Sequence, residues 1–463
     1  MTIGDVIERL NTIRQPRAED APISLNRQLL RLAGPSLVEN LLQTMLLVCD
    51  MMFVGQLGAE AIAGVGLGGQ LTIFLQVLFM GLAVGNTALV ARAVGAGNKP
   101  EAERVAKQSL MLAIVISLVV GTATWFFADD IVRVMGADAT VNTIASGFLR
   151  IVSLFSVVMG VMFIGGGTLR GAGDTFTPMW ITGFINVINI VLGYSFIFGN
   201  FGFPRLGPLG SATATTIART VGAGMILYAL FKRTKILPLS LRGGWGFHRA
   251  VIARLLNIGL PAAAEQLVFQ IGFLAFAAMA VSLGTQDYAA QQIAFTINNL
   301  SIMPAFAFGV AATTLVGQNL GAKDPERAEQ SAYKALKNGT LWMVVMGVAF
   351  LIWRGPLIRL FTNDPDVWQP AEMCLTFIAF GQPLLAVSVI LASALRGAGD
   401  TRATLVMTFA GIWIMRVGLG YLLGIVLGLG LFGMWIAWFS DFAVRAVLVT
   451  LRFRTGRWKT LRV

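Results

Sequence analysis

Twelve long apolar runs divide the sequence, and they constrain its fold more than any other feature. A membrane-spanning helix needs about 20 mainly apolar residues, and lipid offers no partner to backbone polar groups outside a helix or a closed barrel. The sequence therefore predicts an all-α integral membrane protein with twelve transmembrane helices. The runs cover residues 32–55, 61–90, 108–128, 143–165, 177–199, 209–231, 255–283, 288–316, 338–360, 370–394, 403–427 and 431–451.

The side chains that most enzymes use are scarce in this chain. Only 13% of its 463 residues are charged, against about 25% in a soluble domain, which excludes a water-soluble enzyme of several domains. His248 is the only histidine, and Cys49 and Cys374 both lie in apolar runs. A histidine-based metal cluster or a Ser-His-Asp triad therefore cannot form inside the spans. We expect no enzymatic activity, no metal and no organic cofactor.

The formal net charge of +12 is distributed unevenly along the chain. Lys and Arg gather before the first run, in every second loop, between the sixth and seventh runs and after the last run, whereas the other loops are acidic. The positive-inside rule then predicts a multi-pass protein of the plasma (inner) membrane with both termini cytoplasmic. The excess charge indicates contact with anionic membrane lipid, and we expect no nucleic-acid partner.

An internal repeat organises the chain into two halves. The heptapeptide Leu-Arg-Gly-Ala-Gly-Asp-Thr at 169–175 recurs at 395–401, and the same offset of 226 residues relates Glu39 to Glu265. We predict two six-helix bundles related by a pseudo-two-fold axis along the membrane normal, with a cleft between them as the substrate path. The predicted segments are a cytoplasmic tail (1–28), the N-terminal bundle (29–233), a cytoplasmic linker (234–249), the C-terminal bundle (250–452) and a second tail (453–463).

Four acidic residues fall inside predicted spans, where ionisable groups are functional candidates by default. Glu39, Gln43 and Asp50 share one stripe of the first span, and Glu39 and Asp50 are about 16 Å apart along it. Glu39 is duplicated as Glu265, which architecture common to both halves explains, although either could be a second functional acid. Asp50 has Phe276 as its counterpart. An unduplicated buried acid indicates a function particular to the N-terminal half.

Polar and basic residues of other spans are candidate partners for these acids. Asn186, Asn189 and Gly193 share one face of the fifth span at a depth near that of Asp50. Asp441 and Arg445 stand at i and i+4, so we expect them to pair, with Arg416 at similar depth and a structural role for the group. Arg150 and Arg219 could partner Glu39 or another acid, and the sequence does not assign these pairs.

These motifs together resemble the multidrug and toxic compound extrusion (MATE) family. The resemblance rests on six plus six helices, the doubled heptapeptide, the stretch 48–58 (VCDMMFVGQLG) and the run 317–322 (GQNLGA), and it extends from about residue 27 to 455. It implies an antiporter that exports amphipathic, usually cationic, compounds in exchange for protons or sodium ions.

The resemblance also implies roles for single residues. In the archaeal and DinF-like branch, Asp50 matches the first-helix aspartate of a proton-responsive site, with Asn189 and Thr215 matching its asparagine and threonine. The second aspartate of that branch falls at Gly193, so this chain has one carboxylate where the branch has two. The sodium-coupled branch has two acids in its C-terminal half. The positions that match them, Gln270 and a leucine at 384 or 385, carry no carboxylate here.

We therefore expect a proton-coupled exporter that works by alternating access as a monomer, with Asp50 as the coupling acid. A sodium ion at Asp50 and Asn189 remains an alternative, because carboxylate and amide oxygens are both hard ligands. A second alternative is a flippase for lipid-linked oligosaccharides, which needs a cationic cleft. Flexible side chains suit a drug cavity, and the candidates for its lining are Gln43, Met45, Leu46, Met162 and Met303.

Overall fold

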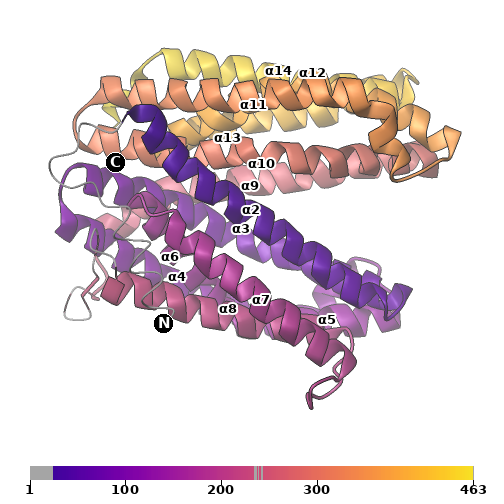
Figure 1. Cartoon of the computed structure of the whole chain (residues 1–463), viewed down its shortest axis with the longest axis horizontal. Helices are drawn as coiled ribbons and strands as arrows, with labels where there is room; N and C mark the ends of the chain where they lie inside the picture. The colour runs from indigo at the N-terminus through magenta and orange to yellow at the C-terminus, as the bar shows by residue number, and fades with distance from the viewer. Residues whose placement is uncertain (1–23, 234–236, 238, 241–242, 244, 462–463) are drawn as a thin grey trace.

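Helices make up all regular structure in the part of the chain that the computed structural model describes, which is residues 24–233, 237, 239–240, 243 and 245–461 (Figure 1). Residues 1–23 of the predicted tail 1–28, residues 234–236, 238, 241–242 and 244 of the predicted linker 234–249, and the last two residues of the predicted tail 453–463 lie outside this part. No strand occurs among the described residues, so the all-α prediction is confirmed.

The described helices run in chain order through two groups. The first group, which we call the N-lobe, consists of α2 (Leu25–Gly55), α3 (Ala59–Gly95), α4 (Lys99–Val134), α5 (Ala139–Leu154), α6 (Ser156–Gly171), α7 (Phe176–Phe198), α8 (Leu209–Tyr228) and the π-helical turn η1 (Ala229–Arg233). The second group, the C-lobe, consists of α9 (Arg249–Leu283), α10 (Thr285–Gly321), α11 (Pro325–Arg359), α12 (Pro365–Gly397), α13 (Thr401–Phe409), the π-helical η2 (Ala410–Leu419) and η3 (Leu422–Val426), α14 (Gly430–Arg454) and η4 (Arg457–Thr460).

Eleven membrane-length helices, or twelve if one bent pair counts as a single span, are present in the described residues. The bent pair is α5 and α6, which meet at 58° where a single fourth span, 143–165, was predicted. The bend lies at Phe155, whose backbone leaves the helical region (φ −106°, ψ 22°). Ser156 Oγ donates to the Ser117 carbonyl at 2.8 Å, and Ser117 Oγ donates to the Ser156 carbonyl at 3.1 Å. These bonds tie the bend to α4.

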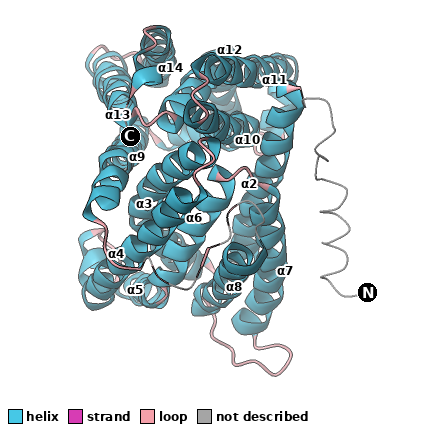
Figure 2. Cartoon of the chain, turned by 90° about the vertical axis from the view of Figure 1, so that its left-hand side faces the viewer, coloured by secondary structure: helices cyan, strands magenta, loops and turns pink. Residues whose placement is uncertain are grey.

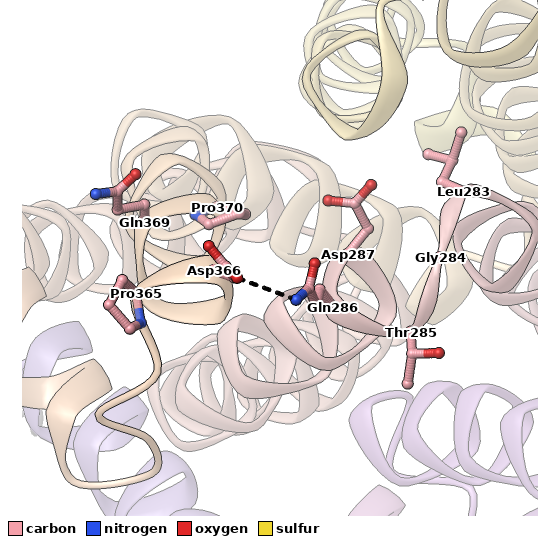
Figure 3. A pocket seen from close by; sticks show the side chains of 9 residues that line it. All are labelled: Leu283, Gly284, Thr285, Gln286, Asp287, Pro365, Asp366, Gln369 and Pro370. Carbon is pink, nitrogen blue, oxygen red and sulfur yellow. Dashed lines mark hydrogen bonds between the residues drawn. The ribbon is translucent and has the colours of Figure 1, made fainter.

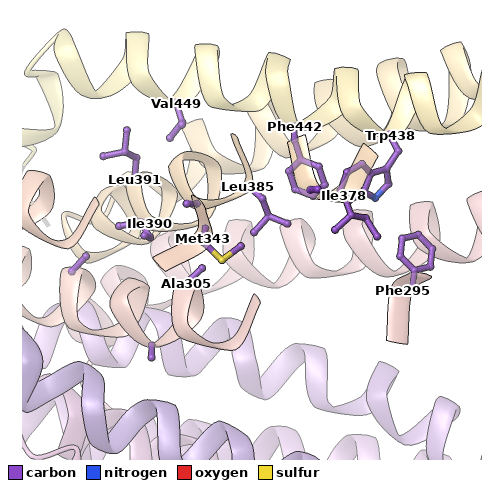
Figure 4. Close-up of a cluster of buried hydrophobic side chains, with 14 of the residues drawn as sticks. Phe295, Ala305, Met343, Ile378, Leu385, Ile390, Leu391, Trp438, Phe442 and Val449 are labelled. Atoms are coloured by element: carbon purple, nitrogen blue, oxygen red, sulfur yellow. The ribbon is translucent and has the colours of Figure 1, made fainter. Parts of the chain in front are cut away.

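The two lobes lie side by side, with α2 crossing between them (Figures 1 and 2). A large apolar core in the C-lobe joins α10, α11, α12 and α14, and Figure 4 shows Phe295, Met343, Leu385 and Trp438 within it. The N-lobe holds smaller buried clusters around α3, α4, α6 and α8. The first helix of each lobe also packs on the other lobe, because Leu29 and Leu32 of α2 belong to the C-lobe core and Leu255 and Ile258 of α9 belong to an N-lobe cluster.

The lobes meet closely at one end, which we call the basic end; it carries the turns at 95–99, 171–176, 321–325 and 397–401. A Cβ on Gly95 would lie 1.9 Å from the Gln318 carbonyl oxygen, and a Cβ on Gly321, its repeat counterpart, 2.0 Å from that of Arg92. Only glycine allows the backbones of α3 and α10 to approach this closely. The opposite end, with the turns at 55–59, 283–285 and 359–365, is the acidic end.

Hydrogen bonds between the lobes reinforce the closure of the basic end. Thr314 Oγ1 of α10 donates to the Arg170 carbonyl at 3.1 Å, and Gln318 Nε2 donates to the Gly171 carbonyl at 3.0 Å. Both acceptors belong to the first copy of the repeated heptapeptide. Among the described residues, no hydrogen bond joins the lobes at the acidic end. The structure is therefore closed between the lobes at the basic end.

Replacing Gly95 with alanine should weaken this closure. The added methyl group would overlap a backbone carbonyl, and overpacking of this kind costs about 1–3 kcal/mol. We expect a lower melting temperature and a longer distance between spin labels placed on the two lobes at the basic end. Gly69→Ala is the matched control, because a Cβ at Gly69 of the same helix has no neighbour within 4 Å. Equal melting temperatures and label distances in the two variants would contradict the assignment of this contact.

Candidate functional site

Asp50 lies against two other helices of the N-lobe, close to the acidic end of α2. Thr215 Oγ1 of α8 donates to Asp50 Oδ2 at a long 3.5 Å, and Asn189 Nδ2 of α7 donates to Thr215 Oγ1 at 2.9 Å. The structure thus brings together the three residues that the resemblance groups. Asn186 lies one turn away on α7, where its Nδ2 donates to the Leu42 carbonyl of α2 at 2.6 Å.

Several oxygen atoms around Asp50 are buried without a hydrogen-bond donor. They are Asp50 Oδ1, Asn189 Oδ1 and Asn186 Oδ1. A buried polar atom without a partner costs about 1–3 kcal/mol, so such atoms mark a place where a proton, a cation or water adds stability. All three are hard oxygen acceptors, so the chemistry of this group favours a small cation or a proton.

Gly193 and Arg219 set the charge of this site. A Cβ on Gly193 would lie 3.9 Å from Asp50 Oδ1 and 3.6 Å from Asn189 Oδ1. A carboxylate at this position would therefore face Asp50, and its absence leaves a single acid. Arg219 of α8 interacts electrostatically with Asp50 but forms no ion pair with it within 4.0 Å. Asp50 is thus a carboxylate without a direct ionic partner.

The other candidate acids are neutralised by arginines of the repeated heptapeptide. Arg170 Nη1 lies 3.1 Å from Glu39 Oε1, and Arg396 Nη1 lies 2.9 Å from Glu265 Oε1. Neither Arg150 nor Arg219 pairs with Glu39, and each interacts with another acid. Arg150 pairs with Asp129 at 2.6 Å, and Arg219 interacts electrostatically with Asp50. The pairing of Glu39 with Arg170 was not predicted, although the repeat duplicates both the arginine and the acid.

Glu265 has further partners that its N-lobe counterpart does not share. Thr404 Oγ1 donates to Glu265 Oε2 at 2.8 Å, and Thr408 Oγ1 donates to Oε1 at 3.0 Å. The equivalent positions beside Glu39 hold Pro178 and Thr182. Both acids are buried, with 7% of each residue exposed. Their symmetric pairing indicates a structural role at the basic end of each lobe.

The expected pairing of Asp441 is confirmed, and it includes both neighbouring arginines. Arg445 binds the carboxylate through Nε at 2.6 Å and Nη2 at 2.9 Å, and Arg416 of η2 forms an ion pair with Oδ2. Asp441 itself is fully buried. The three residues form one cluster inside the C-lobe, away from Asp50.

The predicted cavity residues occupy different environments. Gln43 and Met45 are exposed, Met45 by 61%, whereas Leu46 is half-buried on the same helix. Met162 packs inside the N-lobe, where its Sδ would lie 3.2 Å from a Cβ on Gly222. Met303 is buried in the C-lobe. The structure does not gather these five side chains at one cavity, and their contact with substrate stays a prediction.

A pocket of about 610 Å³ opens at the acidic end of the C-lobe (Figure 3). The starts of α10 and α12 line it, and Gln286 Nε2 donates to Asp366 Oδ2 at 3.3 Å. Burial raises the pKa of the neighbouring Asp287 carboxyl. No group of three or more His, Cys, Asp or Glu side chains that could hold a metal ion occurs among the described residues. The pocket is separate from the Asp50 site.

Comparison with known proteins places the chain in one family. The MatE family model matches residues 35–195 and again 261–422, which are equivalent segments of the repeat. The chain is 34% identical over 447 residues to a probable multidrug resistance protein NorM of Thermotoga maritima, covering 95% of this chain and 94% of that protein. It is 30% identical over 439 residues to the multidrug resistance protein MdtK of Yersinia pseudotuberculosis, covering 92% and 95%.

A solved structure supports the same placement. An outward-facing multidrug resistance MATE family transporter of the MOP superfamily superposes with a TM-score of 0.87 at 26% identity, covering 94% of this chain and 97% of that chain. The doubled match of the family model and the identity along almost the whole chain agree with this fold. The chain therefore belongs to the MatE family, and it is a multi-pass membrane transporter rather than an enzyme.

Proposed function

We propose that this transporter is a secondary active antiporter that exports amphipathic, cationic drugs or metabolites in exchange for protons, with Asp50 as the coupling acid. The observation that carries the proposal is that Asp50 has no ionic partner. Glu39, Glu265 and Asp441 are each ion-paired with arginine, whereas Asp50 has no ion pair and one unbonded oxygen. The relatives named as multidrug resistance proteins support drugs as the class of substrate.

The closed basic end supports a direction for the cycle. By the positive-inside rule the basic end faces the cytoplasm, with both termini on that side, in the inner membrane. Asp50 then lies nearer the outer surface, where a proton can reach it while the lobes are closed inside. Protonation removes the attraction of Asp50 for a cationic substrate, which leaves outward. The lobes then rock, and the proton leaves inward with a gain of about 2.3 kcal/mol per 100 mV of membrane potential.

A sodium ion is the second candidate for the coupling ion. The unbonded oxygens of Asp50, Asn189 and Asn186 are the kind that Na⁺ accepts. Dye efflux from proteoliposomes under a pH gradient alone, and then under a sodium gradient alone, separates the two candidates. We expect the pH gradient to suffice, in line with the proton-coupled DinF-like branch. Efflux driven only by the sodium gradient would show that the coupling ion is sodium and not the proton.

The flippase alternative has less support. A flippase for pyrophosphate-linked glycans needs several free cations gathered in its cleft. Arg170 and Arg396 are each bound to a carboxylate, and Arg416 and Arg445 share the carboxylate of Asp441 inside the C-lobe. One chain carries both lobes and the Asp50 site, so we propose that the transporter works as a monomer in contact with anionic lipid. Gln43, Met45, Leu46, Met162 and Met303 remain the proposed contacts for the substrate.

Asp50→Asn should abolish proton-coupled efflux. The amide keeps the size of the side chain but cannot take up and release a proton, so we expect at least a tenfold loss of dye transport driven by a pH gradient in proteoliposomes. Asp130→Asn is the control, because Asp130 forms only an exposed ion pair with Arg133. Normal pH-driven transport by a correctly inserted Asp50→Asn variant would end the proposal.

Gly193→Asp should change the number of protons carried in each cycle. The new carboxylate would stand beside Asp50 Oδ1, and two acids at this separation resist simultaneous ionisation, so a second proton is taken up. We expect the proton-to-substrate ratio, measured from the gradient that just balances transport, to rise from about one towards two. Gly193→Asn has the same shape without the charge, and it should leave the ratio unchanged. A ratio that rises equally in both variants would show that the effect is steric.

A further inference from the structure

The Asp441 cluster carries more positive than negative charge. One carboxylate is bound by two guanidinium groups, those of Arg416 and Arg445, so the cluster has one formal positive charge in excess. The exposed fractions of the three side chains are 0% for Asp441, 3% for Arg416 and 12% for Arg445. The two other buried acid–arginine contacts described above, at Glu39 and Glu265, are one-to-one. The C-lobe cluster is therefore an unbalanced charge in a region of low dielectric.

This cluster occupies the place that the Asp50 site has in the N-lobe. At the offset of 226 residues, Asp441 is the counterpart of Thr215 and Arg445 is the counterpart of Arg219. The counterpart of Asp50 is Phe276, which is fully buried. Arginine thus occurs at this place in both lobes, whereas the carboxylate comes from α2 in the N-lobe and from α14 in the C-lobe. The second arginine, Arg416, has Ile190 as its counterpart and occurs in the C-lobe alone.

Arg416 has a hydrogen-bond donor that the cluster does not use. A guanidinium offers five N–H donors, and a carboxylate has about four acceptor positions, so one carboxylate cannot serve two guanidinium groups fully. Nε of Arg416 is buried and has no hydrogen-bond acceptor, whereas Nη2 lies 2.5 Å from Asp441 Oδ2. Burying a charged donor in this state costs more than burying a neutral one, because the charge also loses its hydration.

The ring of Phe442 lies beside both guanidinium groups of the cluster. Its centroid lies 5.3 Å from Cζ of Arg416 and 4.5 Å from Cζ of Arg445. A cation–π contact covers the face of a guanidinium, whereas the N–H groups point outward in its plane. Arg416 also belongs to the π-helical segment η2. Such segments are rare in proteins, and those that occur are often at functional sites.

We propose that the Arg416–Asp441–Arg445 cluster is an anion site that binds one monovalent anion at the edge of Arg416. The chemistry fits an inorganic halide or a single carboxylate group, because either balances one positive charge and accepts a hydrogen bond from Nε. The site is independent of Asp50, since it lies on η2 and α14 of the other lobe. It gives the C-lobe a ligand of opposite sign to the one proposed for the N-lobe.

The test begins with melting of the purified, full-length protein at constant ionic strength. Sodium isethionate, a bulky sulfonate, is replaced stepwise by sodium chloride, bromide or acetate. A ligand that binds only the folded state raises the melting temperature in a saturable way. We expect a rise of several degrees with at least one of these anions. A flat response to all three would overturn the proposal.

Substitutions show whether the rise in melting temperature arises from anion binding at this cluster. Arg416→Met removes the excess charge with a side chain of similar length and should abolish the rise, whereas Arg150→Gln, which breaks an ion pair at the surface, should retain it. Asp50→Asn should also retain it, so loss of dye efflux without loss of the anion effect separates this inference from the proposed function. An anion effect that persists in Arg416→Met would place the site elsewhere and overturn the proposal.

If Arg416→Met does not fold, crystals of the unsubstituted protein soaked in bromide test whether an anion binds at Arg416. The expected result is anomalous density beside Nε of Arg416, and its absence at a bromide concentration that saturates the melting effect would overturn the proposal. Acetate distinguishes the two sources of the anion. Displacement of bromide by acetate indicates that the site takes the carboxylate of an organic compound, and a response to halides alone indicates an inorganic ion.

Discussion

Neutralisation of charge inside a low-dielectric helix bundle is the constraint on which the rest of this structure depends. An isolated charge is so costly there that acids and bases of the spans must meet, and their meeting points fix how the helices pack. Glu39 with Arg170 joins α2 to α6, and Glu265 with Arg396 joins α9 to α12. These two contacts hold the first helix of each lobe against its copy of the repeated heptapeptide.

Comparison of the two halves of the repeat distinguishes structural features from functional ones. Features present in both halves are architectural. The Glu–Arg pairs join helices within each lobe, and the close glycines Gly95 and Gly321 hold the lobes together at the basic end. Features present in one half break the symmetry. Asp50 stands where the C-lobe has Phe276, and Asp441 stands where the N-lobe has Thr215. The duplicated framework thus carries two sites of different charge, and the difference between them arises from a few substitutions.

Asp50 and Arg416 both depart from one-to-one pairing, and they lie in different lobes. Asp50 has no ion pair, and Arg416 adds a second guanidinium to Asp441. The proposed roles of both follow from the same physical reasoning, since an unbalanced charge inside the membrane gains stability from a proton or ion that completes it. Thr314 and Gln318 join the lobes at the basic end. At the acidic end, near which Asp50 lies, no hydrogen bond joins the lobes among the described residues.

The sequence by itself determined the all-α membrane fold, because lipid permits so few backbone conformations that twelve apolar runs allow little else. It also determined the repeat and singled out Asp50 as an acid of the first span without a counterpart in the seventh. Only the tertiary structure decided the partners. Glu39 and Arg170 are separated by 131 residues, and no local pattern says which buried arginine will reach which acid. The bend at Phe155 and the excess charge around Asp441 were likewise decided by packing, because each depends on atoms that the fold brings from another helix.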